Sequence, residues 1–172
     1  MMDTEHPQVT VTVGDRSAEV DAGVADLIEQ LWLADIDTVL SCEDNPAGMV
    51  WVQFDTAVGA ENFLNVVARY EGEPGSLYRR ASDAWQPVSD EPAWANWEYD
   101  VSLSDLALDE EVDAAGEVTR LHHPGRPDFV FAVSVRFPRS DYAVVCRRLR
   151  DYNRRRATQC VCPLCDDPPT DS

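Results

Sequence analysis

Apolar and polar positions alternate with two distinct periods along this chain, and the periods predict strands and helices in a mixed order. Strict alternation at Val9–Val13, followed by Gly14-Asp15, predicts a first strand that turns into a second at Ser17–Val20. Apolar residues at three- and four-residue spacing predict helices over 21–34, 57–70 and 140–156. The remaining apolar runs predict strands at 38–40, 49–54, 97–106 and 128–137.

Two details of this pattern bear on the fold. Asp21 precedes the first helix and is predicted to be its N-cap, because a carboxylate there accepts a bond from a free amide of the first turn. Residues 71–96 contain five glycines and prolines and are predicted to form an irregular insertion. We expect Trp85, Trp94 and Trp97 to anchor this insertion to the core, with base stacking as the alternative.

The element order predicts an α+β protein. Residues 1–156 are expected to form one domain, a two-layer sandwich with a ferredoxin-like strand-helix-strand-strand-helix-strand core and an extra C-terminal strand and helix. Residues 157–172 lack periodicity and are interpreted as a Cys/Pro-rich tail. This type of fold carries many functions, so it selects none of them.

Charge is divided unevenly along the chain. The sequence has 32 acidic residues against 14 basic ones, and every basic residue is arginine. Eight arginines fall between Arg136 and Arg156 against Asp141 and Asp151, so that segment carries +6 and the remainder −24. Dispersed acids without lysine are typical of salt-adapted proteins, and GC-rich codon usage is the alternative explanation.

The arginine-rich segment is the predicted interaction surface. The candidate residues project from the helix 140–156 opposite its apolar stripe: Arg147, Arg148, Arg150, Arg154 and Arg155. Guanidinium groups bind phosphate with two parallel hydrogen bonds, so a phosphate-bearing ligand or nucleic acid is one expected partner. Pairing with the chain's own abundant carboxylates, or with those of a neighbouring subunit, is the favoured explanation of these arginines, and a protein partner or self-association is a further alternative.

Three cysteines close together predict a metal site in the tail. Cys160, Cys162 and Cys165 could hold one zinc ion, with a fourth ligand from His122, His123, Cys42, Asp166 or another subunit. Redox-active thiols or an incidental tail are the alternatives. Cys42 itself is followed by two carboxylates, which raise a thiol's pKa, and no histidine with suitable spacing accompanies it. We therefore expect a turn there and no nucleophile. Cys146 is expected to be a small core residue.

No segment predicts export or membrane insertion. The N-terminus is acidic and polar, unlike the basic start of a signal peptide, and no apolar run approaches the length of a bilayer span. A cytoplasmic location without membrane contact is the expectation. The odd number of cysteines argues against a secreted disulfide framework.

One stretch resembles small uncharacterised proteins of actinobacteria, haloarchaea and their phages. The shared features are an apolar helix ending in Leu31-Trp32, a Thr38-x-x-Ser41-Cys42 strand and an aromatic strand at Trp51–Phe54. The resemblance covers residues 20–64, and Asp35 stands where these proteins usually have glycine. It implies a phage or prokaryotic accessory protein and brings no activity with it.

These observations favour a non-enzymatic binding or accessory module of a salt-adapted prokaryote or its virus. In this interpretation the arginine-rich helix at 140–156 forms the interaction surface. An acidic mimic of nucleic acid, acting as a defence inhibitor, is the first alternative. A metal- or thiol-dependent enzyme that uses Cys42 and the tail is the second.

Overall fold

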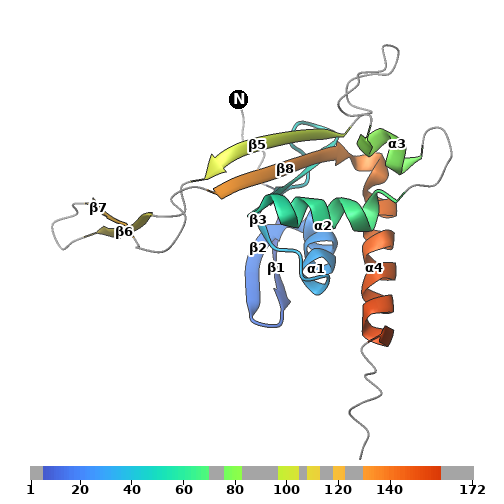
Figure 1. Cartoon of the computed structure of the whole chain (residues 1–172), viewed down its shortest axis with the longest axis horizontal. Helices are drawn as coiled ribbons and strands as arrows, with labels where there is room; N and C mark the ends of the chain where they lie inside the picture. Colours follow the sequence, from blue (N-terminus) through green and yellow to red (C-terminus); the bar gives the residue numbers. More distant parts are fainter. Residues whose placement is uncertain are drawn as a thin grey trace, which may run out of the picture.

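A four-stranded antiparallel sheet in the order β3-β4-β8-β5 forms one layer of the protein (Figure 1). Its strands are β3 (Thr38–Cys42), β4 (Met49–Phe54), β5 (Glu98–Ser104) and β8 (Val130–Pro138). The computed structural model describes residues 6–69, 76–82, 97–104, 108–112, 118–122 and 130–159. The two central strands are thus far apart in the sequence and are joined by long-range pairing.

The alternating pattern of β4 determines which face of the sheet is buried. Val50, Val52 and Phe54 are fully buried, while Trp51 and Gln53 between them are half-buried on the opposite face. In β8, Val135 lies opposite Val52 and is equally buried. The two central strands therefore present one continuous apolar face to the helices.

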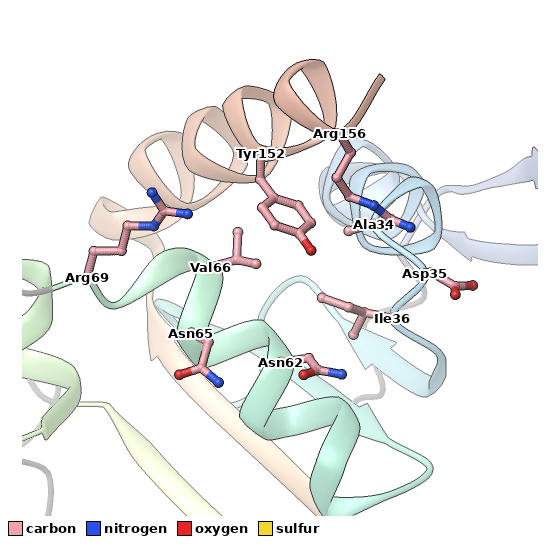
Figure 2. Close-up of a pocket in the computed structure, with 9 residues that line it drawn as sticks. All are labelled: Ala34, Asp35, Ile36, Asn62, Asn65, Val66, Arg69, Tyr152 and Arg156. Atoms are coloured by element: carbon pink, nitrogen blue, oxygen red, sulfur yellow. The ribbon is translucent and has the colours of Figure 1, made fainter. Parts of the chain in front are cut away.

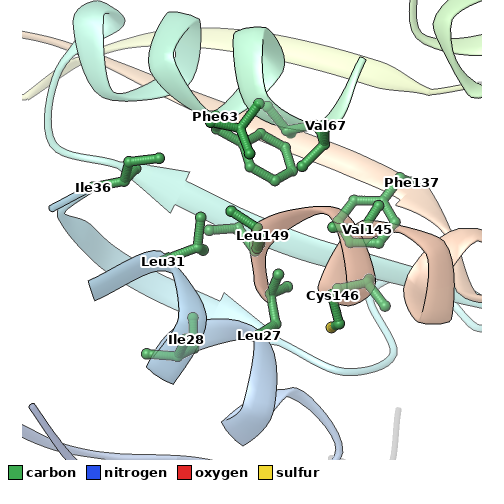
Figure 3. Close-up of a cluster of buried hydrophobic side chains, with 14 of the residues drawn as sticks. Leu27, Ile28, Leu31, Ile36, Phe63, Val67, Phe137, Val145, Cys146 and Leu149 are labelled. Carbon is green, nitrogen blue, oxygen red and sulfur yellow. The ribbon is translucent and has the colours of Figure 1, made fainter. Parts of the chain in front are cut away.

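Three helices cover that face: α1 (Ala25–Leu33), α2 (Ala57–Val67) and α4 (Tyr142–Gln159). Figure 3 shows their shared core, in which Leu31 of α1, Val67 of α2 and Leu149 of α4 lie together above the sheet. The Thr56 hydroxyl caps α2 by accepting a hydrogen bond from the Gly59 amide at 3.1 Å. None of the helices in the described ranges has the length and apolar character needed to span a bilayer.

Two hairpins and a short helix complete the described part of the chain. They are β1 (Gln8–Val13) with β2 (Arg16–Asp21), β6 (Leu108–Val112) with β7 (Val118–His122), and α3 (Leu77–Ser82). The first hairpin turns at Gly14, whose φ of 62° suits a residue without a side chain. This hairpin lies beside α1, and the second extends away from the helices (Figure 1).

The α+β class is confirmed, and the ferredoxin-like core is not. In the described residues, β1 and β2 pair with each other and form a separate sheet, so neither strand before α1 joins the four-stranded sheet. Every pair within the larger sheet is antiparallel. The order of elements alone could not separate these arrangements, because strand pairing depends on contacts between distant segments.

The prediction that Asp21 caps the first helix holds only for its position. Asp21 is the N-cap residue of a 3-10 turn at Ala22–Val24 that precedes α1, but its side chain makes no capping bond. Its carboxylate instead accepts a hydrogen bond from the Glu43 amide, at 3.2 Å. Tertiary contact with the loop after β3 has therefore replaced the local cap.

Two further expectations need correction. The strand predicted at 128–137 begins at Val130, and its Phe131 is 60% exposed, because the far ends of β5 and β8 extend beyond the helices (Figure 1). The hairpin of β6 and β7 adds two strands that the apolar pattern did not predict. The buried position of Trp97 agrees with its expected role in the core, while Trp85 and Trp94 lie outside the described residues.

Candidate functional site

The arginines of α4 do not share one face of the helix. Its buried stripe of Val145, Cys146 and Leu149 packs between α1 and α2. Arg150 therefore lies on the flank next to α1, and Arg148 on the flank next to α2. The remaining α4 arginines, Arg147, Arg154, Arg155 and Arg156, are exposed.

Pairing with the protein's own carboxylates accounts for some of these side chains. Arg150 donates to Asp26 of α1 at 2.5 Å, and Arg154 pairs with Asp151 one turn away. Arg148 donates to the Val67 carbonyl at the end of α2, at 2.5 Å. Among the described residues, no carboxylate lies within ion-pair distance of the exposed Arg147, Arg155 or Arg156. Within the described residues, carboxylates thus engage Arg150 and Arg154, and a backbone carbonyl engages Arg148.

A cleft of about 330 Å³ lies between the end of α2, the turn after α1 and the last turns of α4. Arg69 and Arg156 lie at opposite ends of it, and the Tyr152 ring stands between them (Figure 2). Asn62 and Asn65 project from α2 along one side (Figure 2). The Arg156 guanidinium lies 5.8 Å from the centre of the Tyr152 ring, within the range of a cation–π contact.

A second hollow of about 170 Å³ adjoins the first and shares Val66 and Arg69 with it. Arg148, Asp151 and Arg155 complete its lining. We refer to the two hollows together as the arginine cleft. Its cationic residues are Arg69, Arg148, Arg155 and Arg156.

The positive charge of the arginine cleft exceeds the negative charge available within it. Of the two carboxylates in the lining, Asp151 pairs with Arg154, and Asp35 shares the Arg16 guanidinium with Asp37, at 3.0 and 3.1 Å. The C-terminal end of a helix carries about −0.5 of an elementary charge, so the ends of α2 and α4 together offset about one of the guanidinium groups of Arg69, Arg155 and Arg156. The cleft is therefore a local cationic site on a protein with a formal net charge of −18.

Sequence patterns singled out the arginines of α4 but not the polar residues that face them. Asn62 and Asn65 lie on α2, and Arg69 follows the end of that helix at Val67. Only the packing of α2 against α4 brings Arg69 next to Arg155. No local pattern in the sequence carries that information.

A second group of polar side chains surrounds Cys42. One ligand atom each of His6, Asp21 and Cys42 lies within 4.8 Å of the others, so this group could hold a metal ion. The expectation that no histidine accompanies Cys42 is therefore wrong, because the β1–β2 hairpin brings His6 to it. Burial raises the pKa of the Cys42 thiol, and the charges of Asp21 and Asp44 raise it further. The neutral thiol is thus favoured.

The structure tests the prediction for Cys146 but not the prediction for the tail cysteines. Cys146 is buried in the core, as expected, and burial together with nearby Asp26 raises the pKa of its thiol to about 12. The tail residues Cys160, Cys162 and Cys165 lie outside the described residues, so the zinc site predicted there stays a prediction. The side chain of His122 and all of His123 also lie outside the described part.

Comparison with known proteins gives one distant relationship. The chain is 26% identical over 133 residues to an uncharacterised protein of Acanthamoeba polyphaga mimivirus. The match covers 76% of this chain and 60% of the viral protein. No protein-family model and no solved structure matches the chain. The relationship supports a link to viral proteins and assigns no family or activity.

Proposed function

We propose that this protein is a non-enzymatic binding module whose arginine cleft holds a small phosphate-bearing ligand. The observation that carries the proposal is the grouping of Arg69, Arg155 and Arg156 in the cleft, where no carboxylate of the described residues lies within ion-pair distance of them. Repulsion between these positive charges raises the free energy of the unliganded protein, and a bound anion would lower it. A ligand that brings negative charge would relieve this repulsion.

The side chains of the cleft suit phosphate in particular. A guanidinium group is planar and donates two parallel hydrogen bonds to a phosphate, which fixes the ligand's orientation as well as its charge. Asn62 and Asn65 add amide donors and acceptors, and Tyr152 adds a phenol and an aromatic face. These groups would recognise the uncharged part of a phosphorylated ligand.

The size and setting of the cleft favour a small ligand over a nucleic-acid duplex. Its larger hollow, of about 330 Å³, falls at the lower end of the range for small-molecule sites. A duplex needs a basic surface that follows the phosphate backbone, whereas acids dominate the rest of this chain. A local cationic site on an acidic protein selects a compact anion.

Inorganic pyrophosphate is the probe for this proposal. We expect calorimetric titration of the full chain at about 0.15 M KCl to detect binding. At this salt concentration, repulsion between the ligand and acidic side chains more than about 8 Å away is largely screened, whereas hydrogen bonds in direct contact with the ligand are retained. R69Q and R156Q should each weaken binding about 10-fold or more, since a charge-assisted hydrogen bond contributes about 1.5–3 kcal/mol.

Arg147 supplies the matched control. It lies on α4 and is exposed, but it does not line the cleft. R147Q removes the same charge as the test variants, so a change below about 2-fold is expected if the site is local. Equal weakening by all three variants would mean that net charge, and not the cleft, governs the affinity. No heat of binding at millimolar pyrophosphate would contradict the proposal directly.

A further inference from the structure

Three potential metal ligands of different chemistry meet where the first hairpin adjoins β3. His6 precedes β1, Asp21 ends β2 and Cys42 ends β3. Pairing of the hairpin places Gln8 opposite Asp21, which brings the residues just before β1 beside the end of β2. One nitrogen, one oxygen and one sulfur ligand atom thus come within 4.8 Å of one another. Residues this far apart in the sequence meet only in the folded chain.

The environment of Asp21 favours a cation. The residue is only 8% exposed, and its carboxylate accepts the Glu43 amide at 3.2 Å. Within the described ranges, no arginine lies within ion-pair distance of it. Burying a carboxylate is costly unless it is paired or coordinates a metal. A metal ion would supply the missing positive charge.

Glu43 is positioned to orient His6. Its Oε1 lies 3.2 Å from His6 Nδ1, and its Oε2 accepts the Gly23 amide at 2.5 Å. Arg139 holds the backbone of the same residue by donating to the Glu43 carbonyl at 2.8 Å. Because Nδ1 faces Glu43, Nε2 is the nitrogen left for a ligand. Histidines that bind metals commonly donate their other ring nitrogen to a carboxylate in this way.

The backbone at Gly23 is adapted to this arrangement. A Cβ atom at that position would lie 1.9 Å from Glu43 Oε2 and 2.8 Å from an Arg139 nitrogen. Any side chain there would displace the Glu43 carboxylate. The absence of a side chain at Gly23 therefore allows Glu43 to reach its position beside His6.

We propose that His6 Nε2, a carboxylate oxygen of Asp21 and the Cys42 sulfur bind one zinc ion, with Glu43 as a positioning residue. The mixed nitrogen, oxygen and sulfur set suits zinc, which accepts all three ligand types. Three protein ligands leave a fourth tetrahedral position open to water or a ligand. The site lies outside the arginine cleft and does not depend on it.

The distances are compatible with a modest closure around the ion. Zinc bonds of about 2.0–2.3 Å place tetrahedral ligands about 3.3–3.8 Å apart. Ligand atoms that now lie within 4.8 Å of one another need to approach by at most about 1–1.5 Å. Side-chain rotation supplies such a movement. Zinc would also remove the thiol proton of Cys42, because a coordinating thiol binds as thiolate.

Zinc content of the full chain tests the proposal once the tail cysteines are removed. We expect C160S/C162S/C165S, loaded with zinc and freed of excess, to keep one zinc per chain by elemental analysis. Adding C42S or H6A should abolish this zinc, and E43Q should weaken affinity about 10–100-fold, as loss of an orienting partner does. Cobalt substitution should give a thiolate charge-transfer band that C42S removes.

D44N is the matched control, because it removes a neighbouring carboxylate that is not a predicted ligand. It should keep the zinc, and circular dichroism should show the same fold for every variant. Zinc retained by C42S would overturn the proposal. Loss of all zinc from C160S/C162S/C165S alone would also overturn it and would place the ion in the tail.

Discussion

Replacing Asp141 with alanine is expected to lower the free energy of unfolding by about 3–5 kcal/mol, the cost of breaking a buried ion pair from one side. Asp141 is 4% exposed and lies just before α4. Its Oδ2 accepts hydrogen bonds from Arg80 Nε at 3.2 Å and from Trp97 Nε1 at 3.0 Å, and its Oδ1 accepts from Arg80 Nη2 at 2.6 Å. One carboxylate thus joins α3, the start of β5 and the start of α4.

The size of this effect follows from what the carboxylate leaves behind. Without it, the indole N–H of Trp97, a residue that is 1% exposed, loses its acceptor inside the core. The guanidinium of Arg80 loses a bidentate partner at the same time.

Urea unfolding followed by tryptophan fluorescence measures this difference. D141N is the matched control, because its amide oxygen can still accept from Trp97 while the charge is lost. We expect it to fall between the wild type and D141A. A loss below about 1 kcal/mol in D141A would show that the bridge behaves as an exposed ion pair.

Replacing Leu149 with alanine is expected to cost about 2–5 kcal/mol of unfolding free energy. Leu149 is fully buried, and Figure 3 places it between side chains of α1 and α2. Its truncation removes apolar contacts with both helices and leaves a cavity where the three helices meet.

L149M tests whether packing volume is the cause. Methionine has a similar volume, so this variant should cost less than about 1.5 kcal/mol. Chemical unfolding of both variants gives the comparison. Similar losses in L149A and L149M would indicate that the shape of the site, and not its filled volume, limits stability.

Sequence periodicity predicted the local elements well. The strand at Met49–Phe54 was expected with the same bounds, because it is a short, almost continuous apolar run and the turn residues Asn45, Pro46 and Gly48 precede it. The three long helices were also expected, within a few residues at their ends. The position of β8 between β4 and β5 could not be predicted, because it depends on pairing between distant segments.

At the candidate sites, too, the sequence predicted local features but not the contacts between distant segments. The arginines of α4 are evident in the sequence, but their distribution between the two flanks depends on how α4 packs between α1 and α2. Asp35 was noted in place of a usual glycine, and its φ of 63° explains why glycine is common there. The grouping of His6 with Cys42 required the first hairpin to fold onto β3. Sequence patterns thus identify the residue types, and tertiary packing determines their partners.

Amide chemical shifts of the full chain during titration with pyrophosphate test the arginine cleft most directly. We expect the largest changes in residues 62–69 and 148–156, which meet at the cleft, with saturation at a common affinity. Amides of the β1–β2 hairpin should change little, since none of its residues lines the cleft. Shifts spread evenly over the exposed arginines, or centred away from α2 and α4, would contradict a phosphate site in the arginine cleft.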